Sequence, residues 1–80
     1  MRVLAQIPHP EFQITLFVWN EKYLLKFELG LLEQTYKFPQ MTVSAPDDVA
    51  AFAREEAFLE KVAQRFEAMQ EDWRLLVEGF

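Results

Sequence analysis

The stretch that decides the fold is Phe12-Gln13-Ile14-Thr15-Leu16-Phe17-Val18-Trp19-Asn20-Glu21-Lys22-Tyr23-Leu24-Leu25-Lys26-Phe27-Glu28-Leu29. Every even position from 12 to 18 and every odd position from 23 to 29 is apolar. Alternation with a period of two is typical of β-strands that bury one face. Folding the two runs about Glu21-Lys22 places Val18 opposite Leu25, and the apolar faces coincide. The stretch therefore predicts a central antiparallel hairpin.

The same alternation continues toward the C-terminus. Gly30-Leu31 places glycine first in a two-residue loop, as a type II′ hairpin turn requires. Leu29 then faces Leu32, at the cost of placing Glu28 opposite Glu33, because like charges directly opposite are unfavourable. This predicts a second hairpin that shares its first strand with the central one.

On the N-terminal side, residues 8–11 can form a loop that places Ile7 opposite Phe12 and Val3 opposite Leu16. Pro39 ends the fourth strand, since proline cannot donate to a sheet ladder. The prediction for residues 1–39 is a four-stranded antiparallel meander in the order 1-2-3-4.

Residues 40–46 are predicted to form a loop, and residues 47–80 a helical segment. Ser44-Ala45-Pro46-Asp47 resembles a helix start with Ser44 as the cap. An apolar seam at helical spacing follows, and it consists of Phe52, Leu59, Val62, Phe66, Met69, Trp73, Leu76 and Phe80. The whole chain is thus predicted to be one α+β domain, with the sheet packed against a long C-terminal helix or helix pair.

The length of the helical segment conflicts with the length of the sheet. A continuous helix from 47 to 78 would extend roughly 48 Å, whereas eight-residue strands span about 27 Å. Either the helix breaks around Arg54-Glu55-Glu56, where Glu56 interrupts the seam, or its C-terminal end overhangs the sheet and packs on a partner. An overhang would leave Trp73, Leu76, Val77 and Phe80 in water unless they were covered.

The charge of the chain is unevenly distributed. Residues 1–46 carry four basic and four acidic side chains, so the remaining four basic and nine acidic ones in residues 47–80 account for the whole net charge of −5. An acidic helix disfavours a general affinity for nucleic acids or anionic membranes. The chain has no cysteine, no recognisable secretion signal and no apolar run of membrane-spanning length, so we expect a cytoplasmic protein.

Residues for chemistry are few. His9 is the only histidine and stands in a Pro-His-Pro turn, without the further ligands that a metal site needs. Ser44 and the threonines lack a neighbouring base, and the carboxylate pairs Asp47-Asp48, Glu55-Glu56 and Glu71-Asp72 are sequence neighbours that point about 100° apart on a helix. With two glycines in the chain, no phosphate-binding glycine loop can form. The sequence therefore predicts no enzyme, no metal and no cofactor.

The sheet face that turns away from the helix is a candidate interaction surface. The register deduced above places the apolar residues Leu4, Phe17, Trp19 and Leu24 on it, with Arg2, Lys26 and Lys37 among them. Aromatic side chains interleaved with cations are what a platform for stacking single-stranded nucleic acid uses. The alternatives are that a second subunit, another protein or the loop at residues 39–45 covers this face, or that it is simply solvated.

Two resemblances accompany these predictions. A four-strand meander followed by one helix is similar in outline to the single-stranded-nucleic-acid-binding ββββα folds, such as the Whirly proteins and the purine-rich-element-binding repeats. That resemblance implies nucleic-acid binding on the sheet and pairing through helices, but those families present a basic sheet and this one is neutral. In addition, Ile7-Pro8-His9-Pro10, Trp19-Asn20, Tyr23-Leu24 and Leu32-Glu33-Gln34-Thr35-Tyr36 resemble a group of small uncharacterised bacterial proteins, which implies no activity and no functional residues.

The sequence thus leads to two function hypotheses. The preferred one is a non-enzymatic binding or assembly domain that pairs as a homodimer, or with another protein, through Phe17, Trp19 and Leu24 on the sheet, Trp73, Leu76 and Phe80 on the helix, or both. The alternative is single-stranded DNA or RNA binding on the sheet, with Phe17 and Trp19 stacking on bases and Arg2, Lys26 and Lys37 contacting phosphates.

Overall fold

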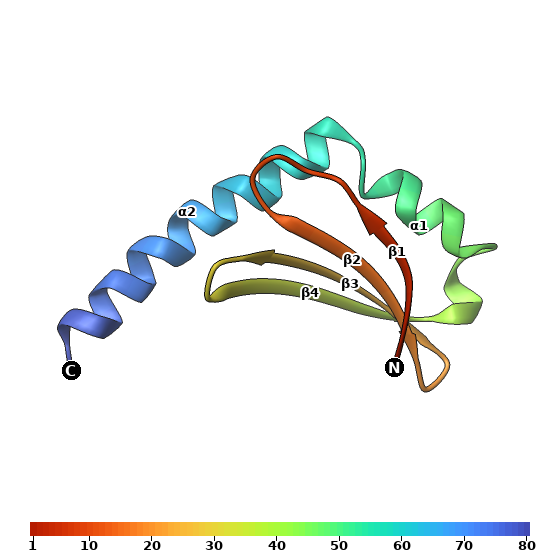
Figure 1. The fold of residues 1–80 in the computed structure, drawn as a ribbon, viewed down its shortest axis with the longest axis horizontal. Helices are drawn as coiled ribbons and strands as arrows, with labels where there is room; N and C mark the ends of the chain where they lie inside the picture. The colour runs from red at the N-terminus through yellow and green to blue at the C-terminus, as the bar shows by residue number, and fades with distance from the viewer.

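A computed structural model describes residues 1–80 as an antiparallel sheet followed by two helices (Figure 1). The strands are β1 (Arg2–Ile7), β2 (Gln13–Trp19), β3 (Lys22–Leu29) and β4 (Leu32–Pro39), paired in the order β1-β2-β3-β4. A short 3₁₀ turn η1 (Gln40–Thr42) leads to α1 (Pro46–Phe52) and α2 (Glu56–Glu78). The predicted α+β fold, with its meander and C-terminal helix pair, is confirmed.

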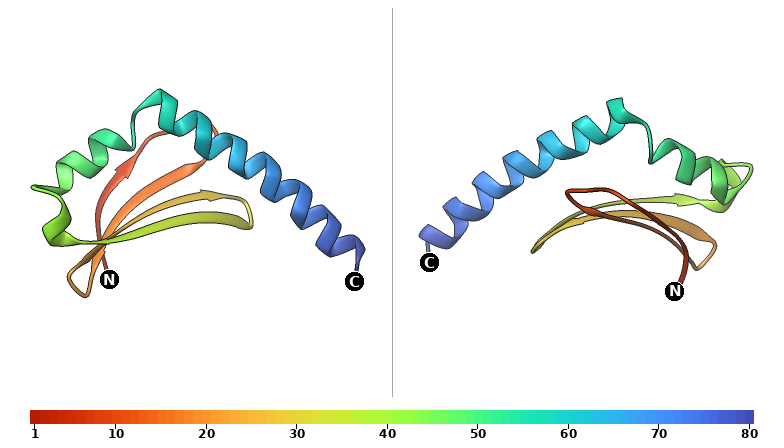
Figure 2. Two further views of the ribbon diagram at one scale, coloured as in Figure 1. Left: turned by 180° about the vertical axis from the view of Figure 1, so that it is seen from behind. Right: turned by 45° about the horizontal axis from the view of Figure 1, so that its top comes forward.

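Both helices lie on the same side of the sheet, as Figures 1 and 2 show, and the opposite face of the sheet carries no element. The core between the two layers is formed by Ile7, Phe12, Ile14, Leu16, Tyr23, Leu25, Phe27, Val49, Ala50, Ala53, Val62 and Phe66. The core residues occupy alternate positions on the strands and positions three or four residues apart on the helices. These are the two spacings of apolar residues that the sequence shows.

The helical segment breaks where the sequence suggested. Helix α1 ends at Phe52 with Ala53 as its C-cap. Glu55 has an extended conformation with φ −71° and ψ 126°, and α2 begins at Glu56. No proline or glycine stands at this elbow. Ala53 is fully buried, and its small side chain lets the chain turn close to the sheet.

The predicted cap at Ser44 is wrong. The residue that precedes α1 in the cap position is Ala45, and no side chain caps the helix. Pro46 occupies the first helical turn, where a missing N–H costs nothing, and Asp47 and Asp48 follow it at the positive end of the helix dipole.

The β3–β4 hairpin has the predicted register, with Leu29 opposite Leu32 and Glu28 opposite Glu33. Gly30 has φ +60°, which is the left-handed conformation that the first residue of this turn needs. The like-charge cost is offset by Lys26, whose Nζ lies 3.1 Å from Glu33 and 4.0 Å from Glu28.

The predicted register of the β2–β3 hairpin is wrong by two residues. Val18 pairs with Tyr23 rather than with Leu25, and the turn consists of Asn20 and Glu21 instead of Glu21 and Lys22. Both turn residues are left-handed, with φ 54° and 63°, as a type I′ turn requires. A shift of two leaves every side chain on its predicted face.

The predicted register of β1 is also wrong. Ile7 pairs with Ile14 and Ala5 with Leu16, and the register then shifts between Val3 and Ala5. Beyond this irregularity Val3 pairs with Phe17, and Arg2 pairs with Val18. Paired residues share a face, so Val3 moves to the open face of the sheet and Arg2 leaves it.

The Asn20-Glu21 turn provides a stability test. A glutamate in the left-handed region is strained by roughly 1–2 kcal/mol, which glycine avoids at some cost in chain entropy. We expect Glu21→Gly to raise the free energy of unfolding by roughly 0.5–1 kcal/mol, seen as a higher urea midpoint. Lys22→Gly, one residue later in β3, serves as the control and should lower the midpoint. A lower midpoint for Glu21→Gly would contradict the turn assignment.

Candidate interaction surfaces

The C-terminal end of α2 extends beyond the tip of the β3–β4 hairpin (Figure 1). Over the sheet, the seam of α2 is buried at Val62 and Phe66 and half-buried at Leu59 and Met69. Farther along, the same seam is in solvent: Trp73 is 43% exposed, Leu76 60% and Phe80 98%. Both outcomes considered for the long helical segment therefore occur, a break and an overhang.

Polar contacts tie α2 to the edge strand β4 before the overhang begins. The Gln34 side-chain amide in β4 donates a 2.9 Å hydrogen bond to the backbone carbonyl of Val62. Arg65 Nε in turn donates a 2.9 Å bond to Gln34 Oε1. These contacts, together with the packing of Phe66 and Met69, fix α2 against the sheet before the overhang begins.

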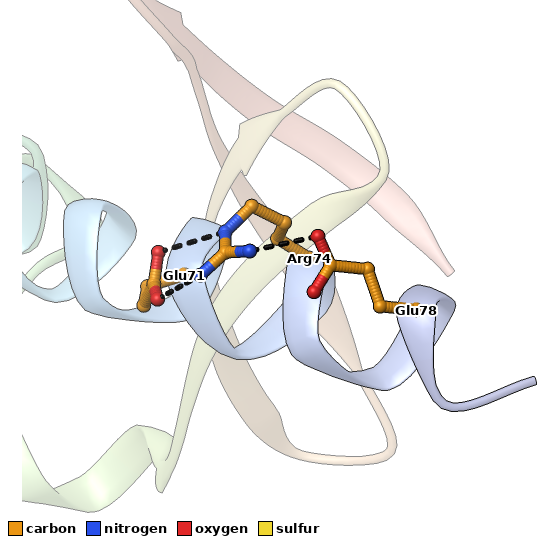
Figure 3. Close-up of polar contacts among 3 residues, drawn as sticks. All are labelled: Glu71, Arg74 and Glu78. Carbon is orange, nitrogen blue, oxygen red and sulfur yellow. Dashed lines mark hydrogen bonds and ion pairs between the residues drawn. The ribbon is translucent and has the colours of Figure 1, made fainter.

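The charged side chains of the overhang gather away from its apolar seam. Arg74 donates through Nε to Glu71 at 3.1 Å and through Nη1 to Glu78 at 2.8 Å (Figure 3). These hydrogen bonds, the one to Glu71 first, raise the pKa of Arg74 above its ordinary value. Spacings of three and four residues keep these three charged side chains together on one side of the overhang, away from Trp73, Leu76 and Phe80.

A hollow of about 340 Å³ lies between the hairpin tip and α2. Leu29, Gly30, Leu31 and Leu32 form one wall, and Gln70 and Trp73 form the other. Leu31 is 84% exposed in the turn itself. Sequence reasoning did not single out Leu31 as a surface residue. The available signal was a leucine at the second position of a two-residue turn, where a polar residue is more usual.

The open sheet face differs from its predicted composition. Leu24, expected at an interface, is buried within the chain, and Phe17 is half-buried. Leu4 packs against the core cluster. Trp19 remains 53% exposed, but it pairs with Lys22 and not with Leu24. Of the predicted residues, Trp19 alone offers a large exposed apolar surface here.

The cations of this face are also fewer than predicted. Arg2 lies opposite Val18 on the other face of the sheet, and Lys26 forms ion pairs with Glu28 and Glu33. The hydrogen bond to Glu33 raises the pKa of Lys26 above its ordinary value. Lys37 stays on this face beside a hollow of about 300 Å³, which it shares with Met1, Phe17 and Lys26. Of the three cations predicted to contact phosphates, Arg2 thus lies on the other face, and the charge of Lys26 is neutralised by Glu28 and Glu33.

His9, the only histidine of the chain, takes a structural position. His9 Nδ1 accepts hydrogen bonds from the backbone N–H groups of Glu11 at 3.1 Å and Phe12 at 3.4 Å. Its ring stacks on Phe12 with 3.9 Å between the centroids. His9 therefore shapes the β1–β2 loop.

No group of three or more histidine, cysteine, aspartate or glutamate side chains is placed to hold a metal ion. Neither helix combines the length and apolar character that crossing a membrane requires. Comparisons with protein-family models, curated proteins and solved structures returned no match to the chain.

Proposed function

We propose that this protein is a non-enzymatic self-assembly domain that pairs as a homodimer through the overhang of α2. The observation that carries the proposal is the continuity of the seam: the face that packs α2 on its own sheet continues into solvent at Trp73, Leu76 and Phe80. An apolar stripe of this kind is costly to leave in water and is typical of an interaction site.

The shape of this region supports a second copy of the chain as the partner. Each copy carries a protruding aromatic side chain, Phe80, and an apolar hollow lined by Leu29–Leu32 and Trp73. In a two-fold pair each hollow can receive side chains of the other copy's helix, so one patch supplies both halves of the contact. The seam positions 69, 73, 76 and 80 alternate in spacing by four, three and four, as helices that pack side by side require.

The charges determine how such a dimer responds to salt. Each copy carries a net charge of −5, and Arg74 is already engaged by its own helix. Pairing therefore brings like net charges together while it buries apolar surface. Screening this repulsion should strengthen the dimer, whereas salt weakens a complex held by opposite charges.

Light scattering on a sizing column, across a concentration series, tests this proposal. We expect the mass to approach that of two chains as concentration rises. The dissociation constant should fall when ionic strength is raised from about 0.1 M to about 1 M, which shortens the Debye length from about 10 Å to about 3 Å. A monomeric mass at the highest concentration in both buffers would overturn the proposal.

The alternative proposal, single-stranded nucleic acid on the open sheet face, is supported by exposed Trp19 and by Lys37 and opposed by the ion-paired Lys26. It is tested in a Trp73→Phe variant, in which Trp19 is the sole tryptophan. We expect an oligothymidylate to leave the Trp19 fluorescence unchanged at low ionic strength. Quenching that is reversed by added salt would support nucleic-acid binding instead.

A further inference from the structure

Strand β4 is the longer and more regular of the two edge strands of the sheet. It pairs with β3 without interruption over eight residues, whereas β1 has six residues and an irregularity between Val3 and Ala5. Short length and irregular pairing protect an edge against the addition of a further strand, and β4 has neither. The edge that can accept another strand is therefore β4.

The backbone groups of β4 that face outward are those of Glu33, Thr35 and Lys37. The two-residue turn makes Leu29 and Leu32 a hydrogen-bonded pair, and such pairs recur at every second residue of an antiparallel ladder. The even-numbered residues of β4 therefore bond to β3, and the odd-numbered ones point away from it. None of the ten backbone hydrogen bonds outside the helices and strands involves residues 33, 35 or 37, so these groups are free to bind a further strand.

Two exposed side chains of this edge carry opposite charges. Glu33 shares one cation with Glu28, because Lys26 Nζ lies 3.1 Å from the former and 4.0 Å from the latter, so one negative charge of this group is not neutralised. Lys37 forms no ion pair within the chain. An antiparallel strand added here is best matched by an acidic residue opposite Lys37 and a basic residue opposite Glu33, four positions later.

An apolar cavity of about 500 Å³ lies beside β4 on the helix-covered side of the sheet. Figure 2 shows the two helices that line it as an arch over the sheet. In the cavity wall, Phe58 packs against the buried Phe27 with 5.7 Å between ring centroids and against Tyr36 at 6.0 Å. Tyr36 and Phe52 also line the cavity and are partly exposed, so it opens to solvent. In an added strand, the residue opposite Tyr36 shares its face, which places that side chain at the mouth of the cavity.

The chain's own β4 does not meet these requirements. Antiparallel pairing of two copies about Thr35 would place Glu33 of each copy opposite Lys37 of the other, but it would also place Gln34 opposite Tyr36. The Gln34 side chain is polar, and it is already hydrogen-bonded to Val62 and Arg65 of its own chain. It is therefore unsuited to an apolar cavity, and the edge fits a segment of another protein better than a second copy.

We propose that β4 binds an extended segment of another protein as a fifth, antiparallel strand of the sheet. The segment has an acidic residue opposite Lys37, a large apolar residue directly after it, and a basic residue opposite Glu33. Backbone hydrogen bonds provide affinity in this mode of recognition, and the cavity and the two charges provide selectivity. The site does not depend on the proposed dimer, because it lies outside the overhang of α2 and a monomer contains all of it.

Fluorescence anisotropy of labelled heptapeptides, titrated with the full chain, tests this site. The peptide VEFTSKV has the required pattern, VKFTSEV exchanges its two charges, and VEATSKV lacks the aromatic ring. We expect saturable binding of VEFTSKV, about fivefold weaker binding of VKFTSEV and about tenfold weaker binding of VEATSKV. Equal affinities for the three peptides, or no binding of VEFTSKV, would overturn the proposal.

Amide hydrogen exchange locates the bound peptide. With VEFTSKV, the N–H groups of Glu33, Thr35 and Lys37 should become protected, while those of β1 should not change. Protection confined to β1, or to residues 29–32 and 70–80, would contradict pairing with β4. Protection of residues 33, 35 and 37 at high protein concentration without peptide would also contradict the proposal, since a second copy would then occupy the edge.

Matched variants separate charge from backbone pairing. The double variant Glu33→Lys with Lys37→Glu keeps the net charge, and it should bind VKFTSEV about fivefold more tightly than VEFTSKV. Thr35→Pro removes one outward N–H and should weaken all three peptides, and it leaves the ladder to β3 intact because proline is tolerated at such edge positions. An unchanged charge preference in the double variant, or unchanged binding by Thr35→Pro, would show that the peptide does not pair with β4.

Discussion

Trp73→Glu is expected to convert the dimer into monomer. Trp73 is the first residue of the exposed seam and also lines the hollow at the hairpin tip, so it would contact the partner on both sides. Losing an aromatic anchor from an interface costs at least about 2 kcal/mol, and burying an unpaired carboxylate adds to that. We expect the dissociation constant to rise by about 30-fold or more, measured by light scattering across a concentration series.

Trp19→Glu is the matched control for this variant. Trp19 is exposed to a similar extent, but it ends β2 on the open sheet face. The Trp19→Glu protein should keep the mass of the unmodified chain. A Trp73→Glu protein that keeps its mass, or a Trp19→Glu protein that loses it, would move the interface from the helix to the sheet.

Phe66→Ala is expected to cause the largest loss of folding stability. Phe66 is almost fully buried, and its ring contacts Phe12 with 5.5 Å between centroids, so it joins α2 to the β1–β2 loop. Removing such a ring costs about 3–5 kcal/mol, a large part of the 5–15 kcal/mol that typical domains possess. The measurement is urea unfolding in the Trp73→Glu background, where dimerisation does not contribute to stability.

Phe80→Ala provides the comparison, because it removes the same ring from the same seam two heptads later. Phe80 lies beyond the last helical residue and is almost fully exposed. In the monomeric background the urea midpoint should stay unchanged, while in the unmodified background the dimer should weaken. Similar losses of monomer stability for Phe66→Ala and Phe80→Ala would mean that the end of α2 packs on its own chain.

The sequence was sufficient to predict the parts of the fold that depend on periodicity and on one glycine. Alternating apolar residues placed Ile14 and Phe27 on the same face, and Gly30 determined the β3–β4 register because it alone supplies the required left-handed turn residue. The overhang could also be predicted, since it follows from comparing the length of a helix with the length of a strand.

The β2–β3 register could not be predicted in the same way. Shifts of two residues leave the apolar faces unchanged, so only the turn distinguishes them, and Asn20-Glu21 is a poorer type I′ signal than Asn-Gly. The irregularity between Val3 and Ala5 has no marker in the sequence, yet it decides which face Arg2 occupies. The prediction that Arg2 lies on the open face beside Lys26 and Lys37 was therefore wrong.

The cavity of about 500 Å³ that Phe52 and Phe58 line beside β4 could not be predicted from the sequence for a different reason. Phe52 belongs to the apolar seam, in which it recurs with Leu59 and Phe66 every seven positions, so the sequence predicts that it is core. The break at residues 53–55 turns it outward, and it is half exposed. The cavity depends on the angle between α1 and α2, which no local pattern encodes. The burial of Leu24 likewise depends on neighbouring strands rather than on its own position.

The proposal that the overhang of α2 is the pairing surface is tested most directly by distances between spin labels. The chain has no cysteine, so Glu71→Cys labels the charged face of the overhang and Glu21→Cys labels the β2–β3 turn, each at a single site. Packed helices lie about 8–10 Å apart between axes. Because Glu71 lies away from the seam, we expect a label-to-label distance between copies that exceeds this separation for Glu71→Cys but is still much shorter than the one for Glu21→Cys. The reverse order, or no dipolar coupling at Glu71→Cys in a dimeric sample, would contradict pairing through α2.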